Sequence, residues 1–120
     1  MNKDSIQKVI ETSDKLRLLN FQKIRAKEKF EVNSILGYES GLFKVDSNLL
    51  VYTSYLLQNG RQKDTIILDS NENPILIKDV RKFQEAIQDR YYTALDVYYN
   101  DIKEVEIIKN GTARYLNLEV

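Results

Sequence analysis

The sequence predicts an α+β protein in which a long N-terminal helix and a long helix in the C-terminal half pack together, with an internal β-hairpin. Three observations support this prediction. The 120 residues include four Gly and one Pro, and this composition favours long regular elements over loops. Apolar residues recur at helical spacing from residue 80 onward, and two β-branched runs joined by turn-forming residues precede them.

The first predicted element is a helix from residue 4 to about residue 30. Its apolar face follows the i, i+3, i+4 spacing and consists of Ile6, Val9, Ile10, Phe21 and Ile24. Polar residues interrupt this face at Ser13, Arg17 and Asn20. A break at residues 12–14, where Ser or Asp would cap a second helix, is therefore an alternative.

The segment from Phe30 to Asp46 has a less regular pattern. Phe30 and Val32 alternate with polar residues as in a strand, and residues 42–45 suggest another short strand after two glycines. Residues 47–58 are ambiguous, because Val51-Tyr52-Thr53 favours a strand by propensity. A good N-cap before this run and Asn59-Gly60 after it favour a mostly buried helix, which is our prediction.

Residues 65–77 are predicted to form the internal hairpin, with runs at 65–69 and 75–77 joined by a turn that contains Pro74. A helix then begins at residue 78. Its apolar stripe, the strongest pattern in the sequence, consists of Val80, Phe83, Ile87, Tyr91, Ala94, Tyr98, Ile102 and Val105. At the C-terminus, Asn110-Gly111 either caps this helix or forms the turn of a second hairpin over 104–119, and we favour the hairpin slightly.

The chain length fits a single domain over residues 1–120, with residues 1–30 as an alternative helical arm. A helix from 78 to 102 would be about 37 Å long, whereas a compact chain of this length has a radius of gyration of about 14 Å. We therefore expect the remaining apolar surface to be buried against another copy of the chain or another protein.

Composition excludes several kinds of active site. With no Cys and no His, the chain cannot form a disulfide, a thiolate zinc site, a Ser-His-Asp triad or a Cys-His dyad. No phosphate-binding glycine motif is present, and no spacing selects a pair of carboxylates. The acidic run 69–73 lacks the Gly and terminal Glu of a calcium loop, so an ordinary turn is favoured. We predict no enzyme activity, no cofactor and no metal.

Lysine and arginine together number 18, as do aspartate and glutamate, and this zero net charge argues against nucleic acid as a partner. The basic run Lys23, Arg25, Lys27 and Lys29 keeps weak nucleic-acid binding as an alternative, although Glu28 and Glu31 dilute its charge. No secretory signal or membrane span is visible. We therefore expect no membrane association and an intracellular location.

Candidate interface residues lie on the second long helix, away from its apolar stripe. Tyr92 and Tyr99 are seven residues apart and form an aromatic row, which protein interfaces favour. The polar residues expected to flank this row are Arg81, Gln88 and Lys103. Packing of the row against the rest of the protein is the competing interpretation. For a small nucleotide, the candidate ligands are Arg90, Arg114 and Tyr91, because Arg offers planar donors and Tyr a stacking face.

The segment from Thr65 to Lys109 joins the hairpin to the tyrosine-rich run Arg90-Tyr91-Tyr92-Thr93-Ala94-Leu95-Asp96-Val97-Tyr98-Tyr99. This third of the chain resembles small accessory or structural proteins of tailed bacteriophages. The resemblance implies a role in virion assembly or host interaction and a location in a host cytoplasm or a virion, and it carries over no catalytic residue. The sequence thus predicts a non-catalytic oligomeric structural or interaction protein. The alternatives are an inhibitor that binds a host protein or sequesters a nucleotide, and a weak nucleic-acid binder.

Overall fold

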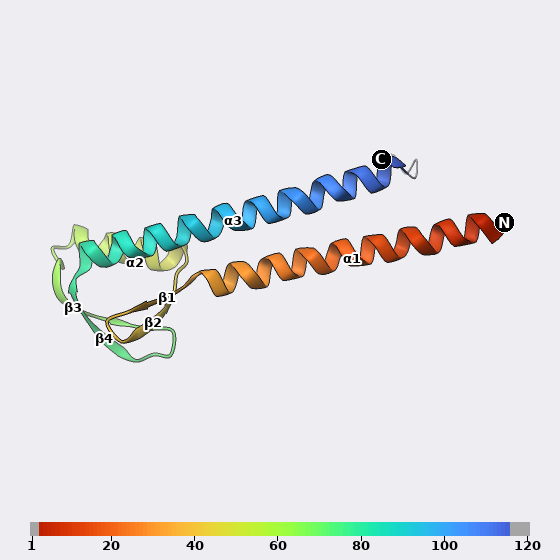
Figure 1. The fold of residues 1–120 in the computed structure, drawn as a ribbon. Coiled ribbons are helices and arrows are strands. Elements are labelled where there is room, and N and C mark those ends of the chain that lie inside the picture. Colours follow the sequence, from red (N-terminus) through yellow and green to blue (C-terminus); the bar gives the residue numbers. More distant parts are fainter. Residues whose placement is uncertain (1–2, 116–120) are drawn as a thin grey trace. The chain divides into compact units, whose positions relative to one another are not determined.

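A computed structural model describes residues 3–115, without the side chains of Lys109 and residues 111–115. These residues form helices and two antiparallel hairpins in the order α1, β1, β2, α2, β3, β4 and α3 (Figure 1). The α+β class is therefore confirmed. The chain divides into two compact units. We call residues up to Lys29 and from Val97 onward the helix-pair unit, and Phe30–Asp96 the hairpin unit.

The first helix, α1, extends over Lys3–Asn33 without interruption. The alternative of a break at residues 12–14 is wrong, because Thr12 stays helical and its hydroxyl donates to the Lys8 carbonyl at 2.7 Å. The strand pattern at Phe30 and Val32 is also misleading, since both residues belong to the last turns of α1. Alternation over three residues is too short a signal to override helix propagation from the preceding turns.

The first hairpin pairs β1 (Ile35–Tyr38) with β2 (Gly41–Lys44) and confirms the short strand expected near residue 42. Its two-residue turn, Glu39-Ser40, has φ angles of 48° and 70°. Both angles lie in the left-handed region, as a type I′ turn requires. At Gly41 an added Cβ would come within 2.7 Å of Ile75 Cγ1, so only glycine lets the two hairpins approach this closely.

Helix α2 occupies Ser47–Gln58, so the helical interpretation of this segment is confirmed. Asp46 is its N-cap, and the carboxylate accepts from the Leu49 N–H at 2.8 Å. At the other end the Gly60 N–H donates to Leu57 O and the Arg61 N–H donates to Leu56 O. With Gly60 at φ +77°, these bonds form a Schellman motif. The capping residues at both ends therefore predicted the secondary structure of this segment correctly, whereas the strand propensity of the residues between them did not.

The predicted internal hairpin pairs β3 (Lys63–Leu68) with β4 (Pro74–Asp79) in a register that places Thr65 opposite Ile77. Asp69 joins the two hairpins. One carboxylate oxygen accepts from the backbone N–H groups of Asn71 and Asn73, and the other accepts from Leu42 N–H in β2. These bonds turn the chain back from β3 and attach the turn to the first hairpin.

Helix α3 extends over Val80–Tyr115, after Asp79 accepts from the Lys82 N–H as an N-cap. The C-terminal hairpin that we favoured is wrong over the described residues. Ile102 and Val105 keep the helical period, Val105 is 5% exposed, and one Gly costs a helix only about 1 kcal/mol. Residues 116–119 of the expected second arm lie outside the described residues.

The hydrophobic core of the hairpin unit surrounds Phe83. The ring of Phe83 lies 4.9 Å from that of Phe43 and 5.0 Å from that of Tyr38, centroid to centroid. The remaining members of the cluster are Val45, Leu56, Ile67, Ile77, Val80 and Ile87. The first part of the predicted α3 stripe, Val80, Phe83, Ile87 and Tyr91, is thus confirmed as a face that packs in this cluster with residues of both hairpins and α2.

In the helix-pair unit, α1 and α3 are antiparallel. Lys23 pairs with Glu106 and Lys29 pairs with Asp101, so rising residue numbers in one helix meet falling numbers in the other. Leu19, Ala26 and Val105 are its buried hydrophobic residues among those described. The predicted packing of the two long helices is therefore present. No described helix has an apolar stretch long enough to cross a bilayer.

Candidate interaction surfaces

Tyr92 and Tyr99, the predicted interface tyrosines, are exposed. Tyr92 belongs to the hairpin unit and its residue is 57% exposed, while Tyr99 belongs to the helix-pair unit and is 67% exposed. Neither ring lies in the core, although the competing interpretation placed both against the rest of the protein. Large exposed tyrosines supply contact area at a low cost in conformational entropy when they bind a partner.

The residues predicted to flank these tyrosines have different surroundings. Arg81 and Lys103 are exposed, and Gln88 is half-buried. Tyr91 is half-buried and packs against the core cluster, with its ring 6.0 Å from that of Tyr92. Tyr91 therefore helps to fix the turn of α3 that carries Tyr92.

The three candidate nucleotide ligands do not form one described site. Arg90 is exposed and Tyr91 packs against the core. Arg114 lies in the last turn of α3, and its side chain is outside the described residues. Neither Arg90 nor Tyr91 lines the pocket described next.

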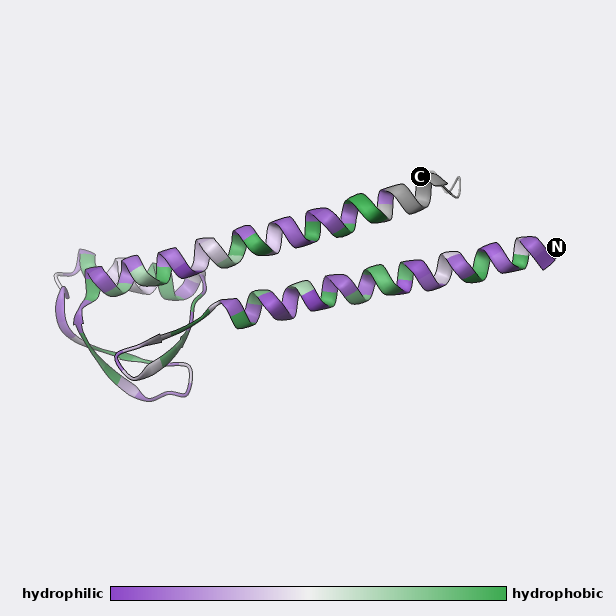
Figure 2. Ribbon diagram, in the orientation of Figure 1, coloured by the Kyte–Doolittle hydropathy of each residue, from purple (hydrophilic) through white to green (hydrophobic). Residues whose placement is uncertain are grey.

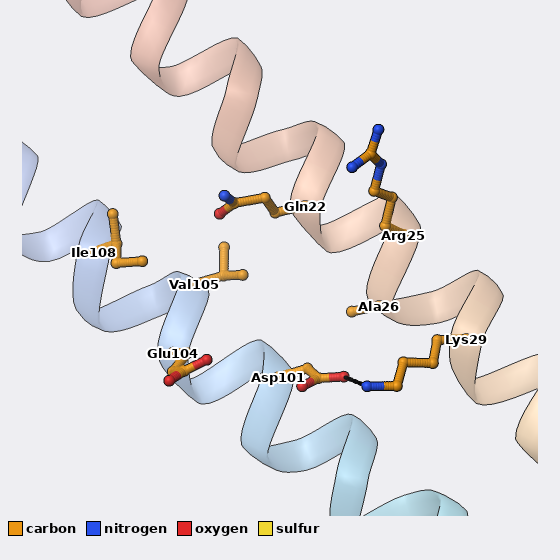
Figure 3. A pocket seen from close by; sticks show the side chains of 8 residues that line it. All are labelled: Gln22, Arg25, Ala26, Lys29, Asp101, Glu104, Val105 and Ile108. Carbon is orange, nitrogen blue, oxygen red and sulfur yellow. Dashed lines mark ion pairs between the residues drawn. The ribbon is translucent and has the colours of Figure 1, made fainter.

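An open pocket of about 270 Å³ lies between α1 and α3 in the helix-pair unit (Figure 3). Ala26, Val105 and Ile108 form its apolar part, and charged residues from both helices surround them. The full lining is Gln22, Arg25, Ala26, Lys29, Asp101, Glu104, Val105 and Ile108. The Lys29 ammonium lies 3.5 Å from the Asp101 carboxylate and partly neutralises this rim. Sequence reasoning missed this pocket, because it depends on the pairing of two distant helices.

The basic run of α1 is partly neutralised by α3. Lys23 pairs with Glu106 and Lys29 pairs with Asp101, which leaves Arg25 and Lys27 as the exposed residues of the run without a described ion pair. Two cations with a neighbouring Glu28 give little of the excess positive charge that phosphate binding requires.

The carboxylate of Asp69, the first residue of the acidic run, accepts hydrogen bonds from backbone N–H groups. The N–H groups of Asn73, Leu42 and Asn71 hold the pKa of its carboxyl below the usual value, against an opposing effect of burial. Within the described part of the chain, no group of three or more acidic or histidine residues is placed to hold a metal ion.

The outer face of the β3–β4 hairpin is a further apolar surface that sequence reasoning missed. Ile66 and Leu76 are directly opposed across the two strands and are 62% and 47% exposed, and Leu68 beside them is 61% exposed. The sequence signal was the unbroken run Ile66-Ile67-Leu68, in place of the alternation expected when one face meets water.

Exposed hydrophobic side chains also occur along α1, where green and purple bands alternate in Figure 2. The apolar face predicted from the sequence is outside the core: Ile6, Val9, Ile10, Phe21 and Ile24 are 46–57% exposed.

Comparison of the chain with protein-family models, with curated proteins and with solved structures returned no match.

Proposed function

We propose that this protein is a non-catalytic interaction protein that works as an oligomer, with apolar helix faces buried between subunits and Tyr92 and Tyr99 as contact residues. One observation carries the proposal. Among the described residues, twenty large hydrophobic residues are exposed, against twelve hydrophobic residues in the core. Single exposed apolar residues are ordinary, but several neighbouring ones on one surface are typical of an interaction site.

The described groups whose pKa is shifted, Asp69 and Tyr38, favour a binding function over a catalytic one. The acidic group with the most altered surroundings, Asp69, already accepts three backbone hydrogen bonds and is not available as a base. Tyr38 has a pKa raised by burial and by the nearby Glu39 and Asp79 carboxylates, so it stays protonated near neutral pH. A role in a phage virion or in a host cell, implied by the resemblance, stays a prediction.

The test is the mass in solution, measured by size exclusion with light scattering over a series of protein concentrations. The proposal expects the mass to rise above 14.1 kDa, the mass of one chain, as concentration increases. A mass of one chain at every concentration would contradict the oligomeric part of the proposal.

A matched pair of variants tests the tyrosines. Tyr92→Ala combined with Tyr99→Ala should weaken assembly or partner binding and leave the fold intact, because both side chains are exposed. Tyr91→Ala is the control, and it should lower thermal stability because Tyr91 packs against the core. If the double variant unfolds and binding follows only stability, these tyrosines are structural residues.

A further inference from the structure

The face of α1 opposite its buried residues carries one continuous line of side chains. At 100° per residue these side chains lie within about 45° of a single direction, which is opposite to that of Leu19 and Ala26. All of them are exposed and belong to the helix-pair unit. We call this line the α1 stripe, and its residues are Lys3, Ile6, Ile10, Asp14, Arg17, Phe21, Ile24 and Glu28.

The order of charged and apolar residues along the α1 stripe matches that of a second copy running in the opposite direction: basic residues face acidic ones and apolar residues face apolar ones. It reads basic, apolar, apolar, acidic, basic, apolar, apolar, acidic from Lys3 to Glu28. When a second α1 lies alongside in the opposite direction, each residue faces the residue of the second copy for which the two residue numbers sum to about 31. Ile10 then faces Phe21 of the second copy, and Asp14 faces its Arg17.

The same register pairs the remaining stripe residues. Lys3 meets Glu28 of the second copy, and Ile6 meets its Ile24. Each contact occurs twice, as a two-fold symmetric dimer requires. A parallel, in-register arrangement would instead oppose Lys3 to Lys3, Asp14 to Asp14 and Arg17 to Arg17, and like charges at such positions disfavour pairing.

We infer that a second copy of this chain docks antiparallel along the α1 stripe, an inference that rests on the oligomeric function proposed above. Ile6, Ile10, Phe21 and Ile24, which are 46–57% exposed, become the apolar centre of the contact. Opposite charges favour the antiparallel direction of pairing, between Asp14 and Arg17 at the middle of the contact and between Lys3 and Glu28 at its ends. Val9 and Leu18, 56% and 59% exposed, flank the contact on either side.

The predicted contact is small for an interface between two proteins. From Lys3 to Glu28 the stripe is about 38 Å long, on a helix about 10 Å wide. The projected contact is therefore roughly 400 Å² per copy, which is at the small end of specific interfaces. Interfaces at this end of the range are typical of transient pairing, so we expect a reversible dimer.

A charge exchange tests the direction of pairing. In the Arg17→Asp variant, the new aspartate at position 17 faces Asp14 of the second copy. The dissociation constant, measured by sedimentation velocity, should therefore rise about tenfold or more. Adding Asp14→Arg to this variant exchanges the two charges and should restore the affinity. Far-UV circular dichroism controls for loss of helix. Equal affinities of the wild type and the single variant would overturn the inference.

Cross-linking tests the register, and the absence of Cys from the chain makes it specific. A mixture of Ile10→Cys and Phe21→Cys proteins should form the mixed disulfide in preference to either homodimer. Preferential Ile10→Cys homodimers would indicate a parallel pair and overturn the inference. If light scattering shows an oligomer but both tests fail, the α1 stripe is not the interface and the proposed function survives. A monomer at every concentration contradicts both.

Discussion

The hairpin unit and the helix-pair unit bury their hydrophobic residues to different degrees. In the hairpin unit, Ile77, Val80, Phe83 and Ile87 have no exposed surface, and both hairpins and α2 contribute to the same cluster. In the helix-pair unit, the described buried hydrophobic residues are Leu19, Ala26 and Val105. The hairpin unit thus has a core formed by several elements of one chain, whereas the helix-pair unit buries only these few hydrophobic residues among those described.

The difference follows from geometry. A helix that packs on strands and on another helix can bury a wide apolar face, because neighbours cover it from several directions. Two helices alone cover only one narrow face of each other, and isolated helices gain little stability without further packing. Ala26 and Val105 are also small, so the pocket beside them stays open.

The largest expected effect is in the hairpin unit. Phe83→Ala removes the ring that contacts Phe43 and Tyr38, and it should lower the free energy of unfolding by about 3–5 kcal/mol. Val105→Ala in the helix-pair unit should cost only about 1–2 kcal/mol. Urea unfolding followed by circular dichroism measures both. Equal losses would mean that the two units are packed alike.

A smaller effect is expected where the two hairpins approach each other. Gly41→Ala places a Cβ within 2.7 Å of Ile75 Cγ1 and should lower the free energy of unfolding by about 1–3 kcal/mol. Gly37→Ala in the neighbouring strand is the matched control, because its Cβ meets nothing within 4 Å. If both variants lose the same stability, crowding at Ile75 is not the reason for glycine at position 41.

A pH-dependent effect is expected at Asp69. Its pKa is lower in the folded chain than in the unfolded chain, so its stabilising effect is present above the usual pKa of about 3.9. That effect is lost as pH falls through the lower folded value. Asp69→Asn should therefore reduce the melting temperature by several degrees at pH 7. The difference from wild type should shrink below pH 3, and a constant difference at all pH values would contradict the assignment.

The smallest effect is expected at the surface ion pair of the helix-pair unit. The Lys29 and Asp101 side chains are 57% and 33% exposed, so Lys29→Gln should change the free energy of unfolding by at most about 1 kcal/mol. The change should decrease as salt is added. Urea unfolding at low and high salt measures it, and a large loss that salt does not reduce would show that this pair organises the unit.

Much of the hairpin unit was predictable from local signals. The caps at Asp46 and Gly60 identified α2, turn residues identified the β3–β4 hairpin, and the helical period identified the buried stripe of α3. The β1–β2 hairpin was only partly predicted, because its type I′ turn uses Glu39-Ser40 in place of the usual Asn or Gly. The same kind of signal misled at Asn110-Gly111, which lies within α3.

The surfaces were less predictable than the elements. The angle of Tyr92 and Tyr99 relative to the α3 stripe was enough to expect that they lie outside it. Helix α1 has two faces that carry apolar residues, and the face with the larger side chains is the exposed one. Local sequence does not decide which face meets α3, because that depends on Val105 and the acidic residues of a helix far along the chain.

The most direct test of the difference between the two units is amide hydrogen exchange of the whole protein at low and high concentration, read by mass spectrometry on peptides. We predict that protection of residues 3–29 increases with concentration as the α1 stripe is covered, while protection of residues 74–96 is high and unchanged. If protection of α1 is the same at all concentrations and as high as that of the hairpin core, the result would contradict our account, in which a second copy covers the α1 stripe.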